Sequence, residues 1–77
     1  MKTIAVDSTT LRTVGYDAER QLLQIEFQNR SIYQYFDVPA AVYEELMQAP
    51  SKGAYFNRAI RQTFDYALVK AASFHSR

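Results

Sequence analysis

The sequence predicts one α+β domain over residues 1–77, a three-stranded antiparallel meander packed against two helices. Three observations predict this fold. Apolar and polar residues alternate in three segments of the first half, as in half-buried strands. Apolar residues then recur three and four positions apart in two later segments, as on one face of a helix. The chain has no cysteine but is 48% hydrophobic, so packing without disulfides must supply its core.

The first two predicted strands run from about Thr10 to Asp17 and from about Gln21 to Gln28. Gly15 within the first suggests a bulge or a close approach of another backbone. The second strand alternates cleanly, with Leu23, Ile25 and Phe27 on its apolar face. A polar, turn-like segment connects the two strands.

The third predicted strand runs from about Ile32 to Val38, after a hairpin loop at Asn29-Arg30-Ser31 in which Asn29 tolerates a left-handed backbone. Its apolar face carries Ile32, Phe36 and Val38, and its other face carries Tyr33, Tyr35 and Asp37. The loop length decides where the tyrosines lie. A three-residue loop places Tyr33 opposite Phe27, on the face that the helices cover, whereas a two-residue loop places Ile32 there. We favour the core position for both tyrosines.

Two helices are predicted to follow. Pro39 suits the first position of a helix that ends at Ala49, with Asp37 as a capping acceptor, and Pro50 terminates it. Its buried face is Val42, Tyr43, Leu46 and Met47. Ser51 is expected to cap a second helix from about Lys52 to Thr63.

The segment from Phe64 to Ala72 suits either a helical extension or an edge strand, and we favour an extended conformation as far as Val69. Residues 73–77 are expected to be frayed, which makes His75 a poor candidate for a ligand.

The charge distribution is uneven although the formal net charge is only +1. Residues 52–77 hold five of the nine Lys and Arg residues but a single acid, Asp65. The charge therefore gives no global signal for nucleic-acid binding, and a basic surface would have to be local. No apolar run is long enough to span a membrane or to form a secretory signal, so we expect a cytoplasmic protein.

Several ordered motifs resemble the KTSC domain, a short domain found at the C-terminus of some lysyl-tRNA synthetases and alone in small bacterial proteins. The resemblance covers about residues 6–66. It rests on Val14-Gly15-Tyr16-Asp17, Leu23-x-Ile25-x-Phe27, Tyr33-Gln34-Tyr35, Val38-Pro39 and above all Ser51-Lys52-Gly53-Ala54-Tyr55-Phe56-Asn57 followed by Ile60-Arg61. It implies RNA binding by analogy with the synthetase context. One departure is the hairpin, which is often glycine-containing in the family but here reads Asn29-Arg30-Ser31.

The candidate RNA contacts each have a structural alternative. Tyr33 and Tyr35 are either a stacking platform for unpaired bases or core residues. Lys52 and Gly53, at a helix N-terminus, either hold a phosphate or form an ordinary cap with Gly53 allowing close packing. The remaining candidates are Arg58 and Arg61, which with Lys52 form either a basic stripe or a solvated helix face, Asn57 between them, and Arg30 at the hairpin tip.

These observations favour a non-catalytic binding module with RNA as its partner. The alternative is a protein–protein interaction module that uses an edge strand, Thr10–Asp17 or the C-terminal segment, or a helix face, including pairing with a second copy. No catalytic constellation is recognisable, so we expect no enzyme activity. With one histidine and no cysteine, we expect no metal site, and no motif points to a small-molecule cofactor.

Overall fold

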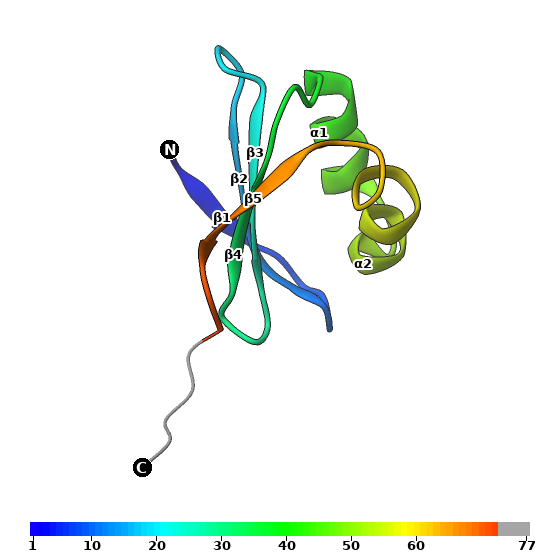
Figure 1. Ribbon diagram of the computed structural model, residues 1–77. Helices are drawn as coiled ribbons and strands as arrows, with labels where there is room; N and C mark the ends of the chain where they lie inside the picture. Colours follow the sequence, from blue (N-terminus) through cyan, green and yellow to red (C-terminus); the bar gives the residue numbers. More distant parts are fainter. Residues whose placement is uncertain (73–77) are drawn as a thin grey trace.

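Five antiparallel strands follow one another in chain order across one sheet, in the order β1-β2-β3-β4-β5. The computed structural model describes residues 1–72. The strands are β1 (Thr3–Ala5), β2 (Leu11–Asp17), β3 (Leu22–Phe27), β4 (Ile32–Tyr35) and β5 (Tyr66–Lys70), and the helices are α1 (Ala40–Gln48), α2 (Lys52–Tyr55) and the π-helical turn η1 (Phe56–Ile60). Figure 1 shows the sheet as one layer and the helices as the other, so the predicted α+β class is confirmed.

The sheet has five strands where the sequence predicted three. β1 was missed because all three of its residues are exposed, which leaves no alternating pattern to detect. It pairs with β2 and places Thr3 opposite Gly15. A Cβ atom on Gly15 would lie 2.9 Å from the Met1 Sδ and 3.1 Å from the Lys2 carbonyl oxygen. Gly15 therefore serves the close backbone approach that the sequence suggested, whereas the bulge lies between Leu11 and Thr13.

The other added strand is β5, in the C-terminal segment for which the sequence allowed either a helical extension or an edge strand. It runs from Tyr66 to Lys70 and pairs with β4, which confirms the extended alternative. Both edge strands are exposed along their length. The predicted fraying of residues 73–77, with His75, lies outside the described residues.

The hairpin between β3 and β4 sets the side on which the tyrosines lie. Its loop is Gln28–Arg30, with the Arg30 amide donating to the Phe27 carbonyl at 2.9 Å. Arg30 takes the left-handed conformation, with φ of 75°. Asn29 was expected to take it, but instead its side-chain oxygen accepts from the Ser31 amide at 3.0 Å. Ile25 therefore faces Tyr33 and Leu23 faces Tyr35, two residues from the predicted register but on the same, helix-covered side.

The predicted faces of the third strand were wrong beyond Tyr35, where the strand ends. Phe36 is 37% exposed rather than buried, whereas Ile32 and Tyr33 lie on opposite faces of the sheet as predicted. Asp37 has φ of 59° and no side-chain hydrogen bond caps α1, so its expected capping role was also wrong. Val38 is buried as predicted, and its carbonyl oxygen accepts the Tyr16 hydroxyl at 2.5 Å.

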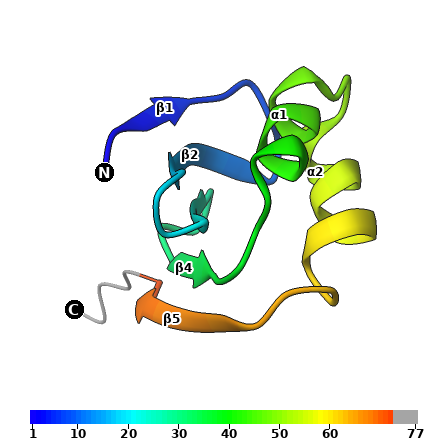
Figure 2. The same cartoon turned by 90° about the horizontal axis from the view of Figure 1, so that it is seen from above.

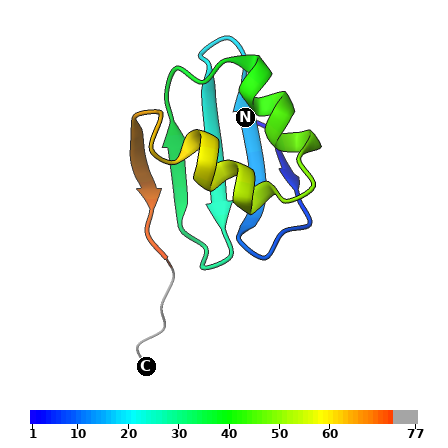
Figure 3. The same ribbon diagram turned by 90° about the vertical axis from the view of Figure 1, so that its right-hand side faces the viewer.

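The two helices pack on one face of the sheet, as the end-on view in Figure 2 and the face-on view in Figure 3 show. The Ser51 hydroxyl caps α2 by accepting from the Ala54 amide at 3.3 Å, as predicted. The helical segment ends at Ile60 rather than Thr63, and its last turn is widened, with the Arg61 amide donating to the Phe56 carbonyl. Between the layers lies the core: Leu11, Val14, Leu23, Ile25, Tyr35, Val38, Leu46, Tyr55, Phe56 and Ile60.

Candidate functional site

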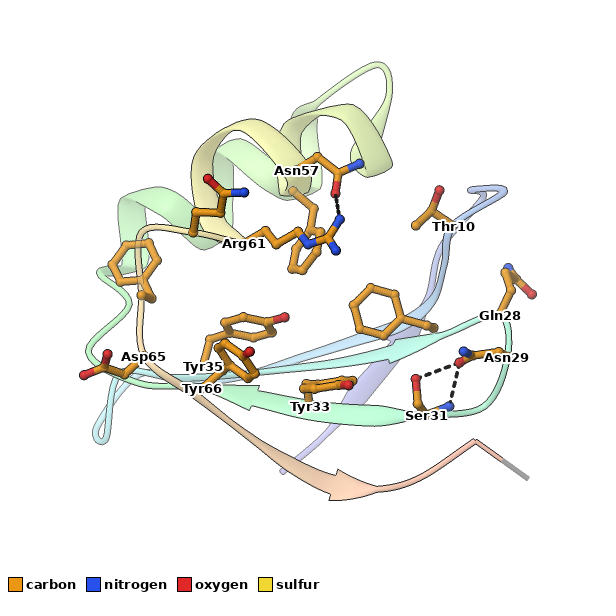
Figure 4. A pocket seen from close by; sticks show the side chains of 14 residues that line it. Thr10, Gln28, Asn29, Ser31, Tyr33, Tyr35, Asn57, Arg61, Asp65 and Tyr66 are labelled. Carbon is orange, nitrogen blue, oxygen red and sulfur yellow. Dashed lines mark hydrogen bonds between the residues drawn. The ribbon is translucent and has the colours of Figure 1, made fainter. Parts of the chain in front are cut away.

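An open groove of about 1080 Å³ lies between the second helical segment and the β4–β5 side of the sheet. Figure 3 shows why: β5 stands outside the cover of the helices. The groove extends from the β3–β4 hairpin to the turn before β5, as the side chains in Figure 4 show. Its lining is Thr10, Phe27, Gln28, Asn29, Ser31, Tyr33, Tyr35, Phe56, Asn57, Arg61, Gln62, Phe64, Asp65 and Tyr66.

Three tyrosine rings form the floor of this groove. The ring centroids of Tyr66 lie 5.7 Å from Tyr33 and 5.6 Å from Tyr35, and those of Tyr33 and Tyr35 are 6.4 Å apart. Strand pairing produces this group, because Tyr35 lies directly opposite Tyr66. Tyr35 is 4% exposed, Tyr33 is partly buried and Tyr66 is 58% exposed. Tyr33 and Tyr66 therefore offer ring surface to a ligand, whereas Tyr35 supports them from the core.

Two phenylalanines hold the floor from behind. Phe56 meets Phe27 and Tyr35 edge to face, with centroids 5.3 Å and 5.4 Å away. Phe27 also meets Tyr33 edge to face at 5.7 Å. Edge-to-face pairs of this kind stabilise a defined ring orientation beyond the area they bury. Residues of β3 and η1 thus pack against the floor rings of β4.

Burial raises the pKa of Tyr35 to about 12, with further increases from the neighbouring Tyr33 and Tyr66 and an opposing effect of Arg61. The Tyr35 hydroxyl is therefore protonated at neutral pH and can donate a hydrogen bond.

The helical wall of the groove carries Asn57 and Arg61, and Figure 4 shows them together above the floor. The Arg61 Nη1 donates to the Asn57 Oδ1 at 3.4 Å. In residues 1–72 the ion pairs are Arg12–Glu26 at 3.7 Å and Arg20–Asp17 at 3.8 Å, so Arg61 has no carboxylate partner there. Arg61 and Asp65 are the charged residues of the lining.

The remaining predicted cations do not line the groove. The Lys52 ammonium donates to the Ala49 carbonyl at 3.1 Å, at the end of α1. The Arg58 guanidinium lies 5.4 Å from the centroid of the Tyr55 ring. Arg30 is exposed at the hairpin tip and is absent from the lining. Lys52 and Arg58 therefore do not join Arg61 in the lining of this groove, and a basic stripe formed by the three residues stays a prediction.

Gly53 is buried against the segment that leads into β2. A Cβ atom there would lie 2.8 Å from the Thr10 Oγ1 and 3.1 Å from the Thr10 Cβ. The side of Gly53 that lacks a Cβ is thus filled by Thr10, and no anion can approach the backbone from that side. Close packing against Thr10 therefore explains why a glycine stands at position 53. This was the structural alternative to phosphate binding in the sequence analysis.

Several groove residues were not singled out from the sequence: Phe27, Gln28, Asn29, Phe56, Gln62, Asp65 and Tyr66. The signal for Tyr66 was present. Alternation of Tyr66 with Leu68 in an edge strand beside the third strand would have placed its ring next to the other two tyrosines. The amides of Gln28 and Asn29 could not be placed without the hairpin register.

Within residues 1–72, no three His, Cys, Asp or Glu side chains gather in a way that could hold a metal ion. Over the same residues, no helix is long and apolar enough to cross a membrane. The expected absence of enzyme activity stays a prediction.

A five-stranded meander with two helices on one face, and a groove lined by tyrosines beside them, defines a small α+β domain. Its family follows from comparison with known proteins. The chain belongs to the KTSC domain family, whose model matches residues 7–64.

Relatives and a solved structure agree with this assignment. A KTSC domain protein of Yersinia pestis superposes with a TM-score of 0.86 at 31% identity, over 88% of this chain and 96% of that one. An uncharacterized protein of Stutzerimonas stutzeri is 41% identical over 61 residues, which are 79% of this chain and 86% of its own. A lysine–tRNA ligase of Nostoc punctiforme is 40% identical over 60 residues, 78% of this chain but only 11% of the ligase.

Proposed function

We propose that this protein is a non-catalytic RNA-binding module whose ligand lies in the tyrosine groove. The observation that carries the proposal is the pair of accessible rings, Tyr33 and Tyr66, beside an arginine without a carboxylate partner among residues 1–72. Aromatic side chains bind unpaired bases by stacking, worth ~1–3 kcal/mol per base. Arg61 would contact a phosphate and Asn57 a base edge.

The lysine–tRNA ligases support an RNA ligand, since their name states that they act on tRNA. Their matched part is only 11% of their length, so the ligase activity itself is no part of the proposal. RNA as the partner also implies a cytoplasmic location. Contacts of Lys52, Gly53, Arg58 and Arg30 with RNA were expected from the sequence, but they are no part of this proposal, because none of these residues lines the groove.

A titration by fluorescence anisotropy against a mixed-sequence RNA pool at low salt tests the proposal. Arg61→Ala should weaken binding, whereas Arg58→Ala on the same helical segment, which removes the same charge outside the groove, should leave it unchanged. Tyr66→Ala is a second probe, because this exposed ring contributes little to the core. Absence of binding to the pool, or equal effects of the two arginine substitutions, would contradict the proposal.

A protein partner at the edge of the sheet is the second candidate. The predicted edge Thr10–Asp17 is interior, because β1 covers it, but β5 is a true edge. Its Tyr66, Leu68 and Val69 are each more than half exposed, at 58%, 53% and 52%. An exposed apolar edge strand can pair with another strand, including one from a second copy. Light scattering over a concentration series should detect a dimer, and Val69→Lys should abolish it.

A further inference from the structure

The lining of the groove is electrically neutral, which limits how a nucleic acid can lie in it. Arg61 contributes one positive charge and Asp65 one negative charge, so their sum is zero. A groove that tracks a phosphate backbone carries several cations, because each neutralised phosphate releases counterions. Here Lys52, Arg58 and Arg30 do not line the groove. The Arg61 guanidinium is therefore the one cation of the lining that can contact a phosphate.

The uncharged polar groups of the groove have unused hydrogen-bonding capacity of both kinds. The Gln28 amide group donates to the Ser8 and Leu11 carbonyls, which leaves its side-chain oxygen free to accept. The Asn29 side-chain oxygen accepts from Ser31, and that of Asn57 accepts from Arg61. The NH₂ groups of both asparagines donate to no atom of residues 1–72, so they remain available as donors.

This combination fits the edge of a nucleobase better than a phosphate. A phosphate offers acceptors only, whereas every base edge that takes part in pairing offers both donors and acceptors. Tyr33 and Tyr66 supply π-faces for the base ring itself.

We infer that the groove binds single-stranded RNA with its bases turned inward and its phosphates outward, with Arg61 as the one phosphate contact. This inference rests on the proposed RNA-binding function and narrows it to unpaired segments. A paired base has its edge occupied and its faces stacked, so the groove cannot take one from a duplex.

Salt dependence gives the sharpest measurement. For single strands, the affinity falls with salt with a logarithmic slope of about −0.7 per phosphate contact, so one contact predicts a loss of about 2.6-fold between 50 and 200 mM salt. Three contacts, by Lys52, Arg58 and Arg61, would give about 18-fold over the same range. Arg61→Ala should weaken binding and flatten the slope, whereas Lys52→Ala and Arg58→Ala should change neither.

The probes are short single-stranded RNA oligonucleotides, one for each of the four bases, titrated against the full chain. A hairpin duplex is titrated in the same way for comparison. Tyr66→Ala should weaken binding by about 5- to 150-fold, the range of one base–aromatic stack. Tyr66→Phe, which keeps the aromatic ring, should retain most of the affinity. Phe36→Ala, at an exposed aromatic outside the groove, is the control.

The outcomes separate the two levels of the proposal. Shallow salt dependence with weak duplex binding supports the inference. Binding of RNA with a steep slope, or of the duplex as tightly as the single strand, would refute the base-inward arrangement and leave RNA binding intact. No binding of any RNA would overturn both.

Discussion

Gly53→Ala tests whether the Ser-Lys-Gly segment serves packing or ligand binding. The added methyl group would sit 2.8 Å from the Thr10 Oγ1 and 3.1 Å from the Thr10 Cβ, whereas ordinary contacts of a Cβ begin at 3.4 Å. At least one atom must therefore move by about 0.6 Å, the difference between the first and last of these distances. Thr10 is β-branched and stiff at χ1, so the side chain alone does not yield easily.

Two opposing effects set the size of the change. Alanine is favoured over glycine in a helix interior by about 1 kcal/mol. Overpacking a close contact costs ~1–3 kcal/mol. Position 53 is near the helix start, where the propensity gain is only partial. The net expectation is a loss of about 1 kcal/mol in the free energy of unfolding, or roughly 4–8 °C in Tm for a domain of this size.

Urea denaturation at constant pH measures this change in the free energy of unfolding. Ala54→Gly, at the exposed next position, is the control that reports the local helix propensity. Thr10→Gly removes both clashing atoms, so a double-mutant cycle should recover most of the Gly53→Ala loss as coupling between the two positions. If Gly53→Ala instead raised the stability by about 1 kcal/mol, as propensity alone predicts, the packing explanation would fail. If Gly53→Ala reduced RNA binding without any loss of stability, the result would indicate that Gly53 serves ligand binding rather than packing.

Three further predictions address the hairpin, the tyrosine floor and the first strand. Arg30→Gly should stabilise the fold by about 1 kcal/mol in urea denaturation, because a left-handed backbone costs a non-glycine residue ~1–2 kcal/mol; a loss would refute the turn geometry. Because the folded-state pKa of Tyr35 is raised from 10.0 to about 12, its stabilising effect is complete below pH 10 and is lost as the pH rises through 12. Tyr35→Phe should make that decline shallower, and an unchanged decline would assign it to other groups. Gly15→Ala should release β1, detected as faster amide exchange in Thr3–Ala5 with little change in the denaturation midpoint, since the new methyl meets the Lys2 carbonyl; unchanged exchange would contradict the close approach.

The elements with strong periodicity were predictable from the sequence, and those set by long-range pairing were not. Alternation in Leu22–Phe27 and the helical spacing of Ala40–Gln48 come from burial on one side, which the pattern records directly. β1 is held by backbone pairing at an exposed edge, so its side chains carry no such record. The hairpin register was missed by two residues because Arg30, not Asn29, adopts the left-handed turn position. The tyrosines nonetheless fell on the predicted side, since a shift of two preserves the face.

The candidate site was harder to predict because the widened last helical turn changes which residues share a face. In an α-helix, residues three apart lie on neighbouring positions, which is why Arg58 and Arg61 were expected to act together. In η1 the Arg61 amide donates to the Phe56 carbonyl, five residues earlier, so each turn contains about one more residue. Residues four apart then align more closely and residues three apart diverge. The contact of Arg61 with Asn57, four residues apart, follows this geometry. Arg58 instead lies over the ring of Tyr55 in the preceding α2 segment, and the Tyr55 hydroxyl donates to Glu45 of α1 at 2.7 Å. The π turn thus favours the pairing of Arg61 with Asn57 at the groove, whose lining contains one cation beside its tyrosines.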